Sequence, residues 1–513
     1  MRLVYLLTHA GLFRNFDSTL RLLAERGHEV HVGLDSPKYP SAALDALVAA
    51  HPNLTVGRTP TPADDRWQAL GRAVRAGSDY VRYLDPRYAD APKLRARARR
   101  AVPPWLRPIV RPGPHLGRVD AVLRRIEASL PIDAAVLDWV RERTPDVLLL
   151  SPLFNSPFQL EAVRAARALG VPSCLTVASW DNLTNKGLIR VAPDTVVVWN
   201  EAQRREAVDL HQIPDDRVVV TGAQNFDEWF ARSATSPAWG FKQRLGLRPD
   251  RPYLLYLGSS SFIAPDEVSF ARRWLRALRT SEEPGLRDIG VLFRPHPQNA
   301  RQWSVEELVS DPQVAIHPSP EDTPQATGRA DWSREDFYDS MAHAAAVVGV
   351  NTTAMIESAV VGKGVYTVLD PDFAETQGGT LHFEHLRAAG GGLLHERERL
   401  EEHVVDLAAA VADGAAPDER SRRFVAAFVR PHGLDRPVTP IMVDALECAA
   451  DRVPDAHPVP ALRPGPPMRA LAAVAVAADR AAATIRRPPK RLRRGVKRSR
   501  ALLGRVLGRG AAA

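Results

Sequence analysis

Short apolar runs alternate with helical patterns through the first part of the chain. Residues 2–7 (RLVYLL) are followed by the polar loop THAGLFRNFD, and apolar positions at helical spacing then run from 18 to Gly27. A second apolar run at 28–34 completes a strand–helix–strand pattern, which predicts a βαβ unit. Further strands are predicted at 146–151, 171–178, 195–200 and 217–222, with a helix at 159–170. Because these runs are apolar throughout, they predict a parallel sheet covered by helices on both faces.

A second series of the same kind begins at 252–260 (PYLLYLGSS). A helix is predicted around 267–280, and further strands at 290–297, 313–318, 345–351 and 364–370. The segment 233–252 between the two series combines turn residues with a short helical pattern and is typical of a linker. The chain of 513 residues is also too long for one ordinary core. We therefore predict an α/β protein with two similar domains, at 1–225 and 226–455, facing each other across a cleft.

Two further regions are rich in arginine. Residues 60–140 interrupt the first domain with a helical insertion, where KLRARARRAVPPWLRPIVRP combines positive charge with Trp105, Leu106 and Ile109. Residues 456–513 form a Pro-rich linker, a short helix and a basic tail. The part from 481 to 513 holds eleven Lys or Arg and no acid, so residues 1–480 carry about −3 although the whole chain carries +8. The basicity therefore belongs to the tail.

Arginine interleaved with Leu and Val favours binding to an anionic membrane surface, and a solvated, disordered tail is the alternative. No nucleic-acid recognition motif accompanies the charge, so no nucleic-acid partner is expected. The two cysteines, Cys174 and Cys448, both stand in apolar settings and predict neither a disulfide framework nor a zinc site. No apolar run reaches the length of a membrane span. We expect a cytoplasmic protein, peripheral at the inner face of the plasma membrane.

Two segments of the second series carry candidate chemistry. VLFRPHP (291–297) is an apolar run that ends in Arg294 and His296, and the run at 347–350 breaks into Asn351, Thr352 and Thr353 before a helical pattern resumes. Each predicts a buried strand that delivers polar residues to its C-terminal end, where parallel sheets bind ligands. Arginine, histidine and a helix start suit phosphate, which indicates a nucleotide-activated donor. Taken singly, each segment could equally be a loop or an N-cap.

The order of these motifs, over roughly residues 1–450, resembles the GT-B superfamily of glycosyltransferases. That resemblance implies two Rossmann-like domains, an acceptor-binding one followed by a donor-binding one. RPHP at 294–297 is similar to the HP element of bacterial sialyltransferases and of polyglycerophosphate-forming transferases, whose histidine contacts a donor phosphate. NTT at 351–353 stands where those families place phosphate-binding serines. GSSS at 258–261 matches the loop after the first donor-domain strand.

The resemblance also implies roles for individual residues. Glu357 would hydrogen-bond the donor ribose, Gln377 in TQGGT would lie near the donor sugar, and Gln224 and Asp227 would lie near the nucleotide. The expected donor-binding set is Gly258, Ser259, Ser260, Arg294, His296, Asn351, Thr352, Thr353 and Glu357. GT-B enzymes use side chains and a helix dipole for the phosphate charge, so no metal and no cofactor are expected.

Acceptor-side residues are predicted in two loops of the first domain. THAGLFRNFDSTL follows the first strand, and either His9 or Asp17 can serve there as the base that takes the acceptor proton, with Asp17 preferred. Asp17 could instead be a helix N-cap. The expected catalytic residues are therefore Asp17, His9 and His296. The acceptor- or sugar-binding set is Arg14, Asn15, Trp180, Asp181, Asn182 and Gln377, with Asn185 and Lys186 in the same polar cluster.

Together these features predict a metal-independent, inverting-type glycosyltransferase. It would move a sugar from a nucleotide-activated donor to a cell-envelope glycan or a lipid-linked acceptor. A CDP-polyol glycerophosphotransferase of the same fold is the close alternative. A nucleotide-sugar 2-epimerase shares the architecture but needs no acceptor, and a non-catalytic, membrane-associated binding subunit would retain the fold without the reaction.

Overall fold

The computed structural model describes residues 1–36, 41–153, 156–283, 285–304, 308, 310–319, 334–414, 417–454 and 465–486. The chain forms two compact units. The main unit holds the described residues of the ranges 1–62, 82–97 and 132–459. The helical unit holds those of 63–81, 98–131 and 465–486. Both predicted strand series fall in the main unit.

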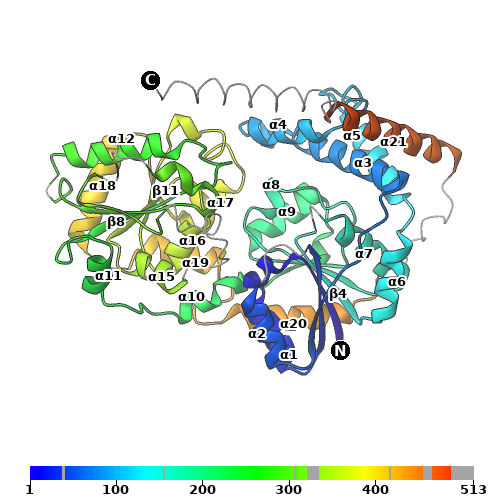
Figure 1. Ribbon diagram of the computed structural model, residues 1–513, viewed down its shortest axis with the longest axis horizontal. Coiled ribbons are helices and arrows are strands. Elements are labelled where there is room, and N and C mark those ends of the chain that lie inside the picture. The colour runs from blue at the N-terminus through cyan, green and yellow to red at the C-terminus, as the bar shows by residue number, and fades with distance from the viewer. Residues whose placement is uncertain are drawn as a thin grey trace, which may run out of the picture. The chain divides into compact units, whose positions relative to one another are not determined.

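The first series forms a seven-stranded parallel sheet of order β3-β2-β1-β4-β5-β6-β7. Figure 1 labels one strand of this sheet, β4. The strands β4 to β6 are buried along their whole length, as expected for strands covered on both faces. The strands are β1 (Arg2–His9), β2 (Glu29–Ser36), β3 (Leu54–Arg58), β4 (Val147–Ser151), β5 (Ser173–Thr176), β6 (Thr195–Val198) and β7 (Val218–Val220).

The second series forms a six-stranded parallel sheet of order β10-β9-β8-β11-β12-β13. In both sheets the connections turn back after the third strand, so the switch in strand order lies between β1 and β4 and between β8 and β11. Such a switch point is where open parallel sheets bind ligands. The strands are β8 (Tyr253–Leu257), β9 (Gly290–Arg294), β10 (Val314–Ile316), β11 (Ala346–Gly349), β12 (Val365–Val368) and β13 (Leu394–Arg397).

Helices cover both faces of each sheet. On the first sheet, α6 (Ala134–Arg143), α7 (Pro157–Ala168) and α9 (Glu201–His211) pack on one face. The other face is covered by α1 (Asp17–Glu25), α2 (Ala42–Ala50) and α20 (Val438–Ala450). On the second sheet, α12 (Glu267–Thr280) and α18 (Leu400–Asp413) cover one face. The opposite core includes α11 (Ala238–Arg244), α15 (Arg334–Ala342), α16 (Ala354–Val360), α17 (Phe383–Ala388) and α19 (Glu419–Phe428).

Short elements complete the main unit. They are the 3-10 turns η1 (Ala10–Asn15), η2 (Pro86–Tyr88), η3 (Asp215–Arg217), η4 (Gln224–Phe226), η5 (Pro297–Trp303), η7 (Pro371–Phe373) and η8 (Ala389–Gly391), and the helices α8 (Asn182–Asn185) and α10 (Asp227–Ala231).

Helix α20 returns the chain to the first sheet. Its residues Met442, Val443 and Leu446 are buried in the same core as α1 and β1. The helix begins where it does because the carboxylate of Asp227 accepts hydrogen bonds from the backbone N–H groups of Val438 and Thr439, at 3.0 and 2.7 Å. The sequence assigned 226–455 to the second domain, whereas α20 packs in the core of the first sheet.

The helical unit contains α3 (Arg66–Arg82), the last turn of α4 (Pro92–Ala101), α5 (Leu116–Ala128) and α21 (Pro466–Arg486). Gly77 lets α3 pack closely, because a Cβ there would lie 2.8 Å from a methyl of Leu106 and 3.3 Å from one of Leu123. The helix predicted before the tail corresponds to α21, and the basic residues from 487 onwards lie outside the described residues. In the part of the chain that the structure describes, no helix is both long and apolar enough to cross a membrane.

Candidate functional site

The loops after β8, β9 and β11 meet at the switch point of the second sheet. Gly258 follows β8, and its N–H donates to the carbonyl of Arg294 at 2.9 Å. A Cβ on Gly258 would lie 2.9 Å from the backbone nitrogen of His296, so only glycine allows the two loops this approach. The oxygen of Ser259 accepts a bond from the N–H of Asn351 at 3.4 Å. The structure therefore brings the three predicted donor loops together.

His296 is half-buried at the start of η5, where it serves as the N-cap. Its Nδ1 accepts the backbone N–H of Gln298 at 3.1 Å. Burial and, to a lesser degree, the charge of Arg14 lower the pKa of His296 to about 4, so the ring is neutral near pH 7. A neutral imidazole has one proton, and because Nδ1 is an acceptor that proton is on Nε2. His296 therefore offers a fixed N–H donor.

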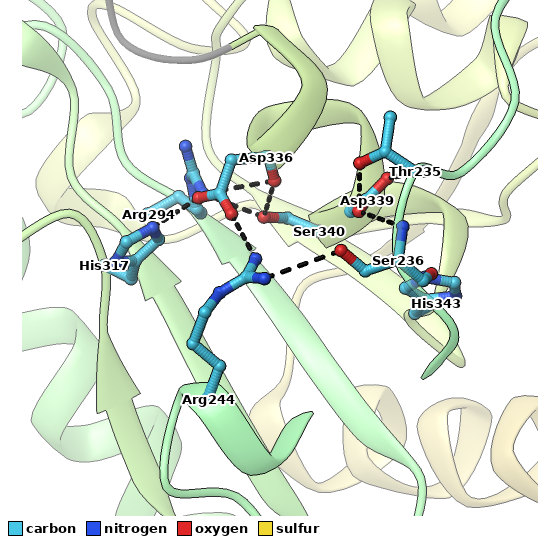
Figure 2. Close-up of polar contacts among 9 residues, drawn as sticks. All are labelled: Thr235, Ser236, Arg244, Arg294, His317, Asp336, Asp339, Ser340 and His343. Carbon is cyan, nitrogen blue, oxygen red and sulfur yellow. Dashed lines mark hydrogen bonds and ion pairs between the residues drawn. The ribbon is translucent and has the colours of Figure 1, made fainter. Parts of the chain in front are cut away.

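The side chain of Arg294 is held by protein partners, and its predicted contact with the donor stays a prediction. Its side chain is 2% exposed. The guanidinium donates to Ser340 Oγ at 2.8 Å and to Asp336 Oδ2 at 3.3 Å (Figure 2). It also lies over the ring of Phe337. Burial lowers its pKa to about 10. Arg294 therefore fixes α15 to the end of β9.

Asp336 is the centre of this polar network. Besides Arg294, it binds His317 through Nε2 and Arg244 at 2.6 Å. Burial raises the pKa of Asp336, but the bond from His317 and the three positive partners outweigh it and hold the pKa well below its usual range. One turn away, Asp339 accepts the N–H groups of Thr235 and Ser236 (Figure 2). These carboxylates anchor α15 to its neighbouring segments.

Three other predicted donor or sugar residues are also buried and serve to hold loops. Ser259 is fully buried, and its N–H donates to Glu267 at 2.7 Å. Asn351 donates to the carbonyl of Thr376 at 2.8 Å. The amide nitrogen of Gln377, 1% exposed, lies within 3.1 Å of the oxygens of Val350, Thr367 and Val368. Direct contact between these side chains and a sugar is therefore not supported, whereas Ser260 and Thr352 remain half-buried.

Glu357 and Arg14 are the two charged residues of the predicted site whose charged groups make no hydrogen bond or ion pair with a described residue. The Glu357 carboxylate is half-buried in α16 and makes no hydrogen bond or ion pair with any described residue. Burial raises its pKa to about 7, and the charge of Arg14 opposes that rise. Arg14, exposed in η1, likewise has no partner among the described residues, yet its charge also lowers the pKa of His296. Arg14 was predicted on the acceptor side, and the structure places its charge near the donor loops.

Side chains of the loop after β5, in the first sheet, contact residues that follow strands of the second sheet. The indole N–H of Trp180 donates to Thr353 Oγ1 at 3.0 Å, and the Trp180 ring meets His382 edge-on at 4.7 Å. Asn185 Nδ2 and Asn351 Nδ2 lie 2.9 and 3.1 Å from the two nitrogens of His382. Burial lowers the pKa of His382 to about 4, so it is neutral near pH 7. His382 has no counterpart in the sequence analysis, although its place just after TQGGT is a signal that could have indicated it.

Two polar residues follow Trp180 in this loop. Asn182 is buried. Asp181 is half-buried and forms an ion pair with the partly exposed Lys186 at 3.3 Å. Burial raises the pKa of Asp181, but the charge of Lys186 and the hydrogen bond from Ser179 lower it, and the pKa lies below its usual value. Asp181 is therefore an ionised hydrogen-bond acceptor paired with the amine of Lys186, and the two groups together suit sugar hydroxyl groups.

Residues 82–97, which we name the strap, hold this loop in place. Arg82 donates to the carbonyls of Leu183 and Thr184, and Tyr83 to that of Lys186 at 2.9 Å. These are the carbonyl groups that the end of α8 leaves without helical partners. The strap also reaches the second sheet, because a Cβ on Gly379 would lie 2.1 Å from the carbonyl oxygen of Asp90. Only glycine fits there, which explains one residue of TQGGT.

The predicted acceptor-side residues have different partners in the structure. His9 ends β1 at the switch point of the first sheet, and burial together with the charge of Arg14 lowers its pKa. Asp17 is the first residue of α1 and pairs with Arg21 at 3.3 Å. The amide of Asn15 donates to the carbonyl of Ala178 at 3.4 Å, so Asn15 joins two loops. Gln224 donates to the carbonyl of Asn15 at 2.8 Å, and Asp227 caps α20, so both have structural partners.

No protein-family model matches the chain, and no curated protein matches it in sequence. The fold is similar to that of UDP-GlcNAc 2-epimerase from Methanocaldococcus jannaschii, with 11% identity and a TM-score of 0.50 over 87% of this chain and 99% of that one. A putative UDP-N-acetylglucosamine 2-epimerase from Listeria monocytogenes matches with 11% identity and a TM-score of 0.50, over 87% and 95%. A glycosyltransferase from Rickettsia africae matches with 11% identity and a TM-score of 0.48, over 89% and 99%.

The two likenesses at a TM-score of 0.50 show the fold. With the two sheet orders, they confirm the predicted class, an α/β protein with two Rossmann-like sheets of the GT-B type. The narrower likeness of RPHP to sialyltransferases and glycerophosphotransferases stays a prediction.

Proposed function

We propose that this protein is a glycosyltransferase that uses a nucleotide-activated sugar and transfers the sugar to a glycan or a lipid-linked acceptor. One observation carries the proposal. The charged groups of Arg14 and Glu357 have no partners among the described residues, and the charge of Arg14 acts to lower the pKa of Glu357. The same charge lowers the pKa of His296 at the switch point of the second sheet. A cation, a neutral N–H donor and a carboxylate match a diphosphate and a ribose diol.

Each of the three groups has a task in binding the donor. The guanidinium of Arg14 and the Nε2–H of His296 bind diphosphate oxygens, and the carboxylate of Glu357 accepts hydrogen bonds from the ribose hydroxyls. Because His296 is neutral, it adds a directed hydrogen bond and no charge. The charge that develops on the diphosphate as it leaves is therefore stabilised mainly by Arg14.

Transfer then needs a base for the acceptor hydroxyl. The hydroxyl oxygen forms a bond to the anomeric carbon while the bond from that carbon to the phosphate oxygen breaks, and the diphosphate keeps the electron pair. His9 takes the hydroxyl proton. We favour His9 over Asp17 because its lowered pKa leaves it neutral and able to accept a proton near pH 7, whereas the Asp17 carboxylate pairs with Arg21.

A nucleotide-sugar 2-epimerase is the second candidate, because two solved structures that share the fold carry that activity in their names. The two functions differ in what they consume. An epimerase interconverts two nucleotide-sugars, needs no acceptor and leaves the nucleotide attached to the sugar. A transferase releases the free nucleotide, and only when an acceptor is present.

The first experiment is a thermal-shift panel of CMP, CDP, UDP, GDP and dTDP on the full chain. At 100 times its dissociation constant, the matching nucleotide should add about 2.7 kcal/mol of stability. We expect one nucleotide to raise Tm of the wild type and to have a much smaller effect on the His296→Ala and Arg14→Ala variants. His51→Ala, a half-buried histidine at the end of α2, is the matched control and should respond like the wild type.

The identity of the nucleotide then sorts the alternatives. UDP, GDP or dTDP supports a conventional sugar donor, and release of that nucleotide from its sugar only with an added acceptor separates transfer from epimerisation. CMP indicates a sialyl donor, and CDP indicates the CDP-polyol transferase. No shift with any nucleotide would refute the donor site and leave a non-catalytic binding subunit as the better description.

A further inference from the structure

The segment 98–131 of the helical unit separates its charges. Its two acids both form ion pairs: Glu127 is 3% exposed and pairs with Arg75 of α3 at 2.9 Å, and the half-buried Asp120 pairs with Arg124 at 2.7 Å. Six other arginines are exposed, and none of them pairs with an acid among the described residues. They are Arg99, Arg100, Arg107, Arg111, Arg118 and Arg125. The exposed arginines of this segment therefore carry positive charge that no ion pair with a described residue neutralises.

Apolar side chains are exposed between these arginines. Ile109 is 49% exposed and stands between Arg107 and Arg111 in the chain, and Val122 is 55% exposed. Arg118, Val122 and Arg125 follow one another at helical spacing, so they share one side of α5. Burial of such aliphatic groups requires a partner with an apolar layer.

The turn that carries Ile109 is attached to the start of α5. The Nε2 of His115, the residue before α5, bonds the carbonyl of Ile109 at 3.2 Å. Leu106 and Val110 of the turn and Leu123 of α5 all pack against the same glycine, Gly77. The turn and the helix therefore form one surface, which we name the basic face: Arg107, Arg111, Arg118 and Arg125 with Ile109 and Val122.

We propose that the basic face docks on an anionic phospholipid membrane, with the arginines on lipid phosphates and with Ile109 and Val122 inserted at the boundary of the acyl chains. Arginine with interspersed aliphatic groups is the composition of interfacial membrane-binding surfaces. A nucleic acid would use the same charges, but it offers no apolar layer to Ile109 and Val122, and the face presents no exposed aromatic ring for base stacking. The observations thus favour a membrane. The proposal does not depend on the reaction that the main unit performs.

The test is sedimentation of the full chain with vesicles. One set of vesicles contains phosphatidylcholine alone, and the other contains about 30% phosphatidylglycerol, whose negative charge attracts basic surfaces. The wild type should bind only the anionic vesicles, and less at high salt. Arg107→Glu/Arg111→Glu/Arg118→Glu should weaken binding by about tenfold or more. The control Arg58→Glu/Arg399→Glu/Arg423→Glu changes the net charge equally at exposed positions of the main unit and should bind within about twofold of the wild type.

Insertion is tested with a second matched pair. Ile109→Asp should weaken binding, whereas Val405→Asp, at a 51% exposed valine of α18, should not. The basic residues of 481–513 are present in every variant, so the comparison reports on the basic face alone. Circular dichroism must show equal Tm values for each pair.

Three results would overturn the proposal. They are the absence of binding by the wild type, equal losses in the face and control variants, and binding of duplex DNA that depends on the same arginines while the vesicles stay unbound. The last result would make the partner a nucleic acid.

Discussion

His296 uses its two ring nitrogens for different purposes, and substitutions can separate them. Nδ1 caps η5 by accepting the N–H of Gln298, and Nε2–H is left to bind a ligand. Asparagine places its amide oxygen near the position of Nδ1, and glutamine places its amide nitrogen near that of Nε2. We expect His296→Asn to keep the stability of the wild type and to lose the nucleotide-induced rise in Tm. His296→Gln should keep part of that rise and lose about 1 kcal/mol of stability with the cap.

The two variants control for each other, because each removes one nitrogen and retains the other. Urea unfolding measures the cap, and the thermal shift with nucleotide measures the ligand. If His296→Asn bound nucleotide as well as the wild type does, the Nε2–H would have no part in binding and the donor site would need another hydrogen-bond donor.

At this scale the sequence predicted which segments meet at the switch point better than it predicted the contacts of their side chains. The RPHP motif could be predicted because an apolar run ends there, and strand alternation already places Arg294 on the same face as Leu292. The sequence could not show that this face meets Asp336, 42 residues further on, which pairs with Arg294 and buries it. Arg14 affects the pKa values of His296 and Glu357, which are far from it in the sequence. No local sequence pattern could show that the fold brings these residues near one another.

The start of α12 contains a buried carboxylate that makes the element sensitive to pH. Glu267 accepts the N–H of Ser259, and burial raises its pKa from 4.5 to about 7. The folded protein therefore holds this proton up to about pH 7, while the unfolded chain releases it near pH 4.5. Stability from this group is present at low pH and is lost as the pH rises from about 4.5 to about 7, by up to about 3 kcal/mol.

Glu267→Gln should remove this loss, because an amide can accept from Ser259 and donate to Tyr256 without ionising. The stability of the variant relative to the wild type should increase between pH 5 and pH 8, as measured by urea unfolding at several pH values. Glu357 and Asp35, whose pKa values are also raised, act in the same window in both proteins and cancel in the difference. Glu282→Gln, at an exposed position, should follow the wild type. A pH-independent difference for Glu267→Gln would contradict the assignment.

Most elements could be predicted because buried parallel strands are apolar along their whole length. The exceptions, β3 and β13, are the outermost strands on one edge of each sheet. The sequence LTVGR of β3 is exposed at Thr55, Val56 and Arg58, and LHER of β13 ends in an exposed arginine. An edge strand is paired on one side only and carries polar residues, so its pattern resembles a loop.

Across the whole molecule, α20 makes the stability of the first sheet depend on residues near the end of the described main unit. Leu446 is fully buried among side chains of the first sheet, although its sequence neighbours follow the second sheet. Leu407 of α18 is also a fully buried helical leucine, but it lies in the core of the second sheet. The packing of α20 on the first sheet could not be predicted from the sequence. The apolar pattern of α20 indicates that the helix is buried, but it does not indicate which sheet the helix packs against.

Replacement of each leucine by alanine should therefore weaken a different sheet. Leu446→Ala and Leu407→Ala should each cost about 2 to 5 kcal/mol, because each removes buried methyl groups and leaves a cavity. Hydrogen exchange followed by peptide mass spectrometry locates the effect: Leu446→Ala should speed exchange in β1 to β7, and Leu407→Ala in β8 to β13. The two variants are matched in residue type and burial, so the position of faster exchange reports on the core to which each helix belongs. Faster exchange confined to β8 to β13 in Leu446→Ala would show that α20 supports the second sheet, against the packing described above.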